Sequence, residues 1–213
     1  MKHLFKIFLL VLAFEGRAQQ QWELYTKKDG VEVYTKNLGQ SDFKAVKTIC
    51  TVDASLSKIA AVLMDVDRTT DWVYATKSCK ILQQYAPHDL LYYAEIGLPW
   101  PASNRDFIIR ITLTQDPQTK VITIRALNKP TYIPEKKNLV RIQQSSGLWQ
   151  ISPVGNGKVR VEYTLQVDPG GLLPAWLVNL FAANGPYDSF RNLQQQVNQP
   201  IYRNASLPNI VNE

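Results

Sequence analysis

The middle of the chain alternates apolar and polar positions and predicts a run of strands. Every second residue from Phe107 to Leu113 is apolar, a period of two that is typical of a strand with one buried face. The same pattern predicts six strands, at residues 79–86, 90–98, 105–115, 121–128, 139–152 and 158–168. The turns between them are short, so consecutive strands are expected to pair antiparallel.

Before this run the pattern predicts two strands and a small helical insert. Residues 31–34 follow the turn signal Asp29-Gly30, and residues 43–52 form a second extended stretch. Ser55 then offers an N-cap to a segment whose apolar residues recur at helical spacing as far as Val66. A short continuation carries Trp72.

After the strands the period changes to that of one long helix. Asp168-Pro169-Gly170-Gly171 ends the last strand, and Pro174 is expected to begin the helix. A kink is expected at Gly185-Pro186. Residues 201–213 are polar and are expected to form a loose tail. The apolar stripe of the helix consists of Leu173, Trp176, Leu177, Leu180, Phe181, Phe190, Leu193 and Val197.

This order of elements predicts an α+β fold. A curved antiparallel sheet with one apolar face, wrapped around a long C-terminal helix, buries the apolar positions of both. The helical insert follows the second strand. The ten residues 129–138 are the longest loop within the run of strands and are expected to form a lid or rim.

The first 18 residues have the layout of a secretory signal peptide. Lys2 and Lys6 flank an apolar run that extends from Ile7 to Phe14, and Gly16-Arg17-Ala18 supplies small residues for cleavage after Ala18. The run is shorter than the roughly 20 apolar residues that a membrane-spanning helix needs. We therefore expect export to the periplasm or the medium, with residues 19–200 forming one domain.

Charge and cysteine content agree with an exported monomer. Removal of residues 1–18 leaves 195 residues and lowers the formal net charge from +6 to +4. The positive charge is spread along the chain, so nucleic acid is not an expected partner, whereas transient contact with an anionic membrane surface is. Cys50 and Cys79 permit one disulfide in an oxidising compartment, or pack as free thiols.

The chain carries few residues of the types that catalytic and metal-binding motifs require. His3 belongs to the signal peptide and His88 to a turn, and the sequence holds neither a nucleophile elbow nor a phosphate loop. We therefore expect no catalytic residue, no metal and no cofactor. Arg105 shares the parity of the apolar positions after it, and Glu95 ends a strand that a tight turn brings near it. The pair forms a structural ion pair or binds a polar headgroup.

Two segments resemble a known family. Residues 99–107, Pro-Trp-Pro-Ala-Ser-Asn-Arg-Asp-Phe, are similar to a signature of the START domains, lipid-transfer domains related to steroidogenic acute regulatory protein that include phosphatidylcholine transfer protein. Residues 168–179, with Asn184-Gly185, resemble the last strand and C-terminal helix of that family. The resemblance covers residues 22–198 in order. The chain departs from the family at Ile111, where one family arginine falls, so the resemblance does not specify the headgroup.

The resemblance implies a helix-grip fold whose sheet and C-terminal helix enclose a tunnel for one lipid or other hydrophobic molecule. The implied function is non-catalytic binding, with transfer between membranes. Two alternatives stay open: an enzyme on the same scaffold that uses a carboxylate such as Glu95 or Asp106 or a tunnel tyrosine, and a ligand-free interaction domain. Expected tunnel and headgroup residues are Tyr93, Glu95, Arg105, Phe107, Ile109, Ile111, Leu113, Trp149, Trp176, Leu177, Leu180 and Phe181.

Overall fold

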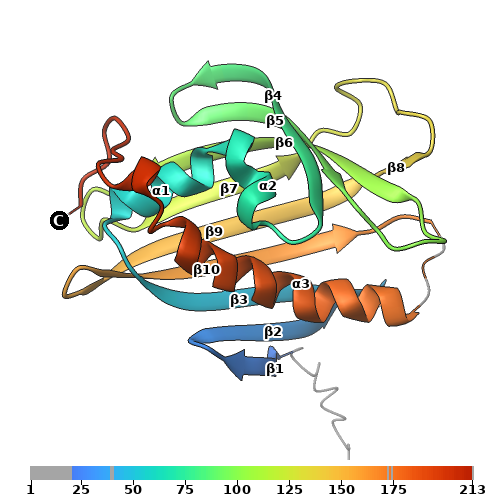
Figure 1. The fold of residues 1–213 in the computed structure, drawn as a ribbon, viewed down its shortest axis with the longest axis horizontal. Coiled ribbons are helices and arrows are strands. Elements are labelled where there is room, and N and C mark those ends of the chain that lie inside the picture. The colour runs from blue at the N-terminus through green and yellow to red at the C-terminus, as the bar shows by residue number, and fades with distance from the viewer. Residues whose placement is uncertain (1–20, 39–40, 172, 174, 213) are drawn as a thin grey trace, which may run out of the picture.

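One strongly curved sheet wraps around a long helix, as predicted (Figure 1). The structure is a computed structural model that describes residues 21–38, 41–171, 173 and 175–212, without the side chains of 41–44, 175, 176, 178–183. The predicted signal peptide lies outside the described residues. The ten described strands have the order β1-β2-β3-β10-β9-β7-β6-β5-β4, and β8 pairs with β6. The sheet is therefore continuous from β1 to β4.

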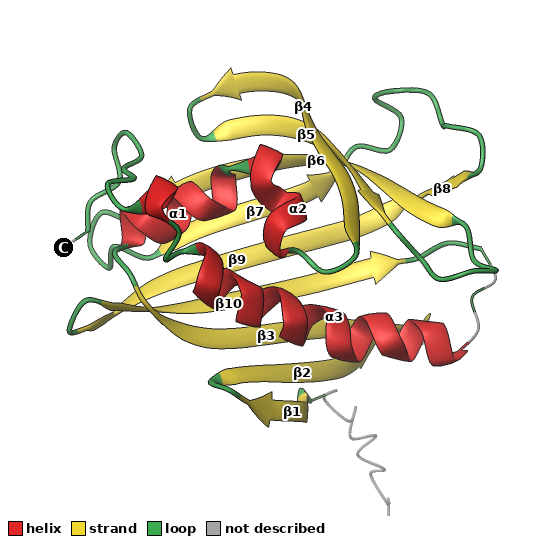
Figure 2. Cartoon of the chain, in the orientation of Figure 1, coloured by secondary structure: helices red, strands yellow, loops and turns green. Residues whose placement is uncertain are grey.

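The strands and helices follow the predicted order, with two additions (Figure 2). The edge strand β1 escaped prediction because its residues are mostly exposed and show no alternation. The expected strand 139–152 is two strands, which differ in their pairing. The strands are β1 Glu23–Lys28, β2 Val31–Leu38, β3 Ser41–Asp53, β4 Thr76–Ala86, β5 Asp89–Ile96, β6 Asn104–Gln115, β7 Ile122–Asn128, β8 Leu139–Arg141, β9 Gln144–Gly155 and β10 Lys158–Asp168. The helices are α1 Leu56–Met64, η1 Val66–Arg68, α2 Thr69–Trp72, α3 Ala175–Gln196 and η2 Pro200–Tyr202.

The break between β8 and β9 corrects the expectation of purely antiparallel pairing. β8 runs parallel to the start of β6, whereas β9 pairs antiparallel with β7 and β10. The Ile142 amide, between the two strands, donates to the carbonyl of Asp106 at 3.0 Å. The chain changes pairing partner there because the loop before β8 returns it to the start of β6, beside Asp106.

Helix α3 lies across the concave face of the sheet and closes the core (Figures 1 and 2). Its second half is anchored by Phe190 and Leu193, which are fully buried together with residues of β2, β3 and α1. Gly185 and Pro186 lie within one continuous helix, which changes direction partway along its length (Figure 1). Helix α1 begins as predicted, since the Ser55 hydroxyl accepts a hydrogen bond from the Lys58 amide.

The two sequence signatures meet in space. Arg105, at the start of β6, donates from Nε to the carbonyl of Pro169 at 3.1 Å and from Nη2 to the carbonyl of Gly170 at 2.9 Å. Its Nη1 donates to the carbonyl of Ser103. The Asp168 carboxylate accepts from the Gly170 amide at 2.8 Å. Arg105 therefore fastens the turn through which the chain leaves β10 for α3.

Asp106, the next residue, faces the opposite side of the sheet and has its own partner. Its carboxylate accepts two hydrogen bonds from Arg141, at 2.7 and 3.0 Å, and both side chains are almost wholly buried. Arg141 also donates to backbone carbonyls of Pro130, Ile133 and Pro134. The loop 129–138, expected as a lid or rim, is instead pinned over the back of β5 and β6, where Ile133 packs against the buried Ile108.

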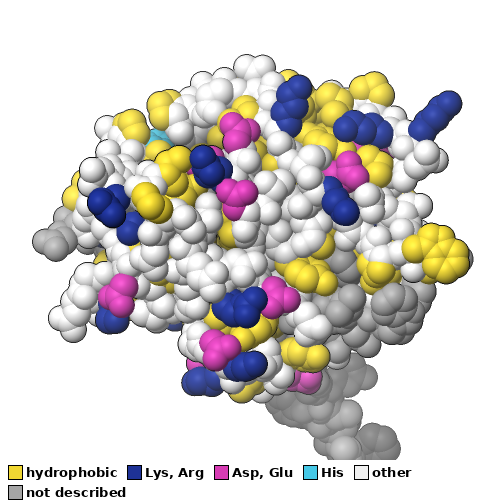
Figure 3. All heavy atoms as spheres, in the orientation of Figure 1, with side chains coloured by type: hydrophobic (Ala, Val, Ile, Leu, Met, Phe, Trp, Pro, Cys, Tyr) yellow, Lys and Arg dark blue, Asp and Glu magenta, His cyan; other side chains and the backbone are white. Residues whose placement is uncertain are grey.

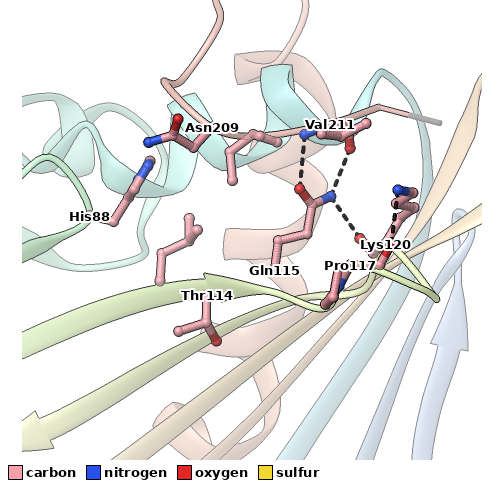
Figure 4. Close-up of a pocket in the computed structure, with 9 residues that line it drawn as sticks. His88, Thr114, Gln115, Pro117, Lys120, Asn209 and Val211 are labelled. Atoms are coloured by element: carbon pink, nitrogen blue, oxygen red, sulfur yellow. Dashed lines mark hydrogen bonds between the residues drawn. The ribbon is translucent and has the colours of Figure 1, made fainter.

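The C-terminal tail is fixed to the domain, which corrects the expectation of a loose segment. The buried Tyr202 donates from its hydroxyl to Asp65 at 2.8 Å. The Ser57 hydroxyl accepts from the Leu207 amide, and the Val211 backbone exchanges two hydrogen bonds with the Gln115 amide group (Figure 4). The tail therefore ties α1 to the end of β6.

The two cysteines are free thiols in the described structure. Burial raises the pKa of Cys50 to about 12 and that of Cys79 to about 11. Both side chains pack against the apolar core, the second of the two roles that the sequence allowed.

Deletion of residues 201–213 is expected to lower the melting temperature by about 5 °C or more, because it exposes core surface and removes the hydrogen bonds of Tyr202, Leu207 and Val211. Thermal unfolding followed by circular dichroism measures the change. Deletion of residue 213 alone, which keeps Tyr202, Leu207 and Val211 in the chain, is the control. An unchanged melting temperature for the longer deletion would show that the tail adds no stability.

Arg105→Leu is expected to destabilise the domain by about 2–4 kcal/mol, because three carbonyls lose a donor. Hydrogen exchange should also accelerate in residues 168–177. Arg110→Leu is the matched control in the same strand: its pair with Asp89 is partly exposed, so a loss of about 1 kcal/mol or less is expected. Urea denaturation and hydrogen exchange measure both. Equal losses in the two variants would contradict an anchoring role for Arg105.

Candidate functional site

A cavity of about 350 Å³ lies between the concave face of the sheet and helices α2 and α3. Its walls come from β3, β5, β6, β7, β9 and β10, and most of the lining side chains are aliphatic or aromatic. The volume lies within the range of about 300–1,000 Å³ that small-molecule sites occupy. The curved sheet leaves this space because a single helix does not fill its concave face.

Aromatic rings line the part of the cavity under the second half of α3. Trp149 of β9 stacks on Tyr163 of β10 with ring centroids 4.1 Å apart, and on Phe190 of α3 at 5.6 Å. Trp72 of α2 meets Trp149 edge to face at 6.3 Å. These contacts make a rigid apolar wall on one side of the cavity.

Several polar atoms are buried in the same walls. Thr48 Oγ1, Trp72 Nε1 and Thr76 Oγ1 have no hydrogen-bond partner among the described residues. Burial raises the pKa of the Tyr92 and Tyr163 phenols well above the usual range, so both hydroxyls stay protonated at any physiological pH. These groups are uncharged hydrogen-bonding sites in an otherwise apolar space.

Arg105 is the one charged side chain among the described residues that line the cavity. It is only 5% exposed, and burial lowers the pKa of its guanidinium, which nevertheless remains protonated at physiological pH. Its hydrogen bonds go to the carbonyls of Ser103, Pro169 and Gly170 rather than to a carboxylate. The structural ion pair with Glu95 considered from the sequence is therefore not formed.

Six of the predicted tunnel residues line the cavity: Arg105, Phe107, Ile109, Ile111, Trp149 and Leu177. Leu113 has the same parity but is packed in the core. It lines a separate small recess beside the tail, together with His88 and Gln115 (Figure 4). The side chains of Trp176, Leu180 and Phe181 lie outside the described structure.

Tyr93 and Glu95 face away from the cavity, which corrects their proposed placement. The β5–β6 register pairs Ile96 with Arg105 and Glu95 with Asp106, so Glu95 shares the outer face with Asp106. Its carboxylate accepts from Asn104 Nδ2 at 2.8 Å. Tyr93 packs with the buried Ile108 on that face, under the Lys136 ammonium.

Sequence reasoning did not assign Thr48, Tyr92 and Tyr163 to the site. Each alternates with outward-facing residues in a strand, and the same parity identifies Tyr92 from its neighbours Ala94 and Ile96, which also line the cavity. Trp72 was placed only on the short continuation of the helical insert. No local signal shows that these four side chains from four elements converge.

The described residues hold no group of three or more His, Cys, Asp or Glu side chains placed to bind a metal ion. None of the described helices is long and apolar enough to cross a membrane.

Comparison with known proteins identifies the family. The START domain model matches residues 15–200. An uncharacterized protein of Pseudomonas aeruginosa is 31% identical over 91% of this chain and 97% of its own length. Human phosphatidylcholine transfer protein is 27% identical over 79% of each chain. The crystal structure of a STAR-related lipid transfer protein from Xanthomonas axonopodis superposes with a TM-score of 0.77 at 27% identity, and covers 84% of this chain and 99% of that one. The chain therefore belongs to the START domain family.

Proposed function

We propose that this protein binds one lipid or other hydrophobic molecule in the cavity and carries it between membranes without catalysis. The observation that carries the proposal is the apolar cavity of about 350 Å³ enclosed by the sheet and α3. The relatives named as lipid-transfer proteins support it. The volume also argues against a ligand-free domain, in which side chains would have filled this space.

The energetics suit a carrier. Moving one methylene group from water into an apolar site gains roughly 0.8 kcal/mol, so an alkyl chain of about 16 carbons gains on the order of 13 kcal/mol relative to water. Relative to a membrane, which is equally apolar, the net change is near zero. A lipid therefore exchanges between bilayer and cavity without a large free-energy difference, and stays bound while the protein crosses water.

The placement of the carboxylates supports binding without chemistry. Glu95 and Asp106, the acids considered for an enzyme on this scaffold, lie on the outer face, hydrogen-bonded to Asn104 and Arg141. No aspartate or glutamate is found among the described residues of the cavity wall. The described cavity wall therefore offers no carboxyl group with a shifted pKa to act as a general acid or base.

The loop between β5 and β6 is the part of the protein that we propose touches the membrane. Trp100, at its tip, is 90% exposed, the most exposed large hydrophobic side chain described. Leu98, two residues earlier, lines the cavity, and Lys77 passes over Gly97 in the same loop. An indole with a cation nearby suits the interface of an anionic bilayer. The face of the protein drawn in Figure 3 mixes charges of both signs, which gives no support to a nucleic-acid partner on that face. We further propose that the protein acts as a monomer after export.

Protein produced in its own host, with its export signal, is expected to carry about one apolar molecule per chain. Solvent extraction followed by mass spectrometry identifies that molecule, and native mass spectrometry gives the ratio. A cavity that is empty in protein purified without detergent, and that takes up no lipid from vesicles, would overturn the proposed function.

Trp100→Ala is expected to reduce lipid transfer from anionic vesicles about tenfold, because the indole no longer buries apolar area in the bilayer. Its melting temperature and copurified lipid should not change, since the side chain is exposed. Val154→Ala is the control and should transfer lipid normally. Val154 is also an exposed hydrophobic residue, but it lies near the end of β9, beside the turn into β10. Equal transfer by both variants would place the membrane contact elsewhere.

A further inference from the structure

The inner part of the cavity contains polar groups that the protein itself does not satisfy. Thr48 is 1% exposed and Trp72 is 5% exposed, yet Thr48 Oγ1 and Trp72 Nε1 lack a hydrogen-bond partner among the described residues. Tyr163 lines the cavity together with Thr48 and Trp72, and burial keeps its phenol protonated. We call Thr48, Trp72 and Tyr163 the inner polar group.

The three side chains lie close together. Tyr163 is directly opposite Thr48 on β3 and Trp149 on β9, so these neighbours share one face of the sheet. Trp149 stacks on Tyr163 and also meets the Trp72 ring edge to face. Residues from β3, β10 and α2 thus gather around one aromatic ring.

An unpartnered buried polar atom costs free energy, because it has lost its hydrogen bonds to water. Folded proteins satisfy the large majority of such atoms. Orphan groups that line an open cavity are satisfied by whatever molecule is held there, and a cargo that displaces water from them must supply the missing atoms. The indole N–H is a donor only, whereas the two hydroxyls both donate and accept. The molecule must therefore present an acceptor oxygen.

The partner atom is expected to be uncharged. No described acidic or basic side chain lies at this part of the wall, and the single cationic side chain of the cavity, Arg105, sits at the β10–α3 turn. From Tyr163 to Asp168 the strand extends five residues, which is about 17 Å. The Arg105 donors at the far end are already directed at backbone carbonyls. A carboxylate or phosphate at the inner polar group would be buried without a counterion.

We propose that the cargo is a lipid with an uncharged hydroxyl or carbonyl oxygen, bound with that oxygen at the inner polar group and with its hydrocarbon body toward Arg105. This inference rests on the proposed function and names the ligand class. It predicts that the polar atom of the cargo, rather than its hydrocarbon end, reaches the part of the cavity under the second half of α3.

Binding of three probes of equal chain length to delipidated protein tests the proposal: tritiated hexadecanol, hexadecane and palmitate, each delivered from cyclodextrin. Hexadecanol is expected to bind about tenfold more tightly than hexadecane, the effect of one net hydrogen bond in a buried site. Equal binding of the two would overturn the inference and leave the proposed function standing. Tightest binding by palmitate would overturn it in favour of an anion site at Arg105. Binding of none would overturn both.

Two variants test whether the inner polar group causes the preference for hexadecanol over hexadecane. Thr48→Val and Trp72→Phe each remove a polar atom and should each lower the ratio of hexadecanol to hexadecane binding at least threefold. Thr48→Val should also raise the melting temperature of the empty protein, because it removes an unsatisfied hydroxyl from an otherwise apolar wall. Ile124→Val, in the cavity wall without a polar atom, is the matched control and should weaken both probes alike. An unchanged ratio of hexadecanol to hexadecane binding in both polar variants would contradict the assignment. So would a Thr48→Val variant with a lower melting temperature and an unchanged ratio.

Discussion

The connection between the sheet and the helix that covers it depends on the buried guanidinium of Arg105. Arg105 is the second residue of β6. Its side chain lies on the cavity side and donates to the carbonyls of Pro169 and Gly170, in the turn that leads from the last strand into α3. A cation in this position needs acceptors, because its charge is removed from water. Backbone carbonyls supply them without adding a carboxylate to the cavity. The hydrogen bond from Arg105 to Pro169 joins β6 to the turn before α3, across 64 residues of sequence.

The cavity follows from the way in which the sheet is covered. On the outer face, the loop 129–138 lies over β5 and β6 and is fixed by the buried pair of Asp106 and Arg141. On the inner face, α3 packs tightly through Phe190 and Leu193 at one end, while Arg105 holds the turn at the other. Between these two anchors a single helix does not fill the concave surface. An apolar space remains that neither anchor closes, and START domain membership agrees with a lipid in that place.

The charges and the polar groups of the site are separated along the length of the cavity. Arg105 stands at the turn before α3, and uncharged hydroxyl and indole groups stand near Trp149. The acids that sequence reasoning associated with the site are on the other face of the sheet, paired with Asn104 and Arg141. The cavity therefore presents an apolar surface with one neutral hydrogen-bonding region, and its one described charged side chain already donates to backbone carbonyls.

The sequence by itself determined the fold class, the order of the main elements and the inward face of β6, because alternation and helix capping are local properties. Phe107, Ile109 and Ile111 line the cavity as their parity predicts. The edge strand β1 escaped prediction because its residues are mostly exposed and show no alternation. The break after Arg141 and the docked tail escaped prediction because each depends on contacts with distant residues. Only the tertiary structure decided which partner each charge has. The register that sets Ile96 opposite Arg105 puts Glu95 on the outer face, and a register is a relation between two strands that neither strand specifies alone. The convergence of Thr48, Trp72 and Tyr163 has the same cause, because it arises from strand order and helix packing rather than from spacing along the chain.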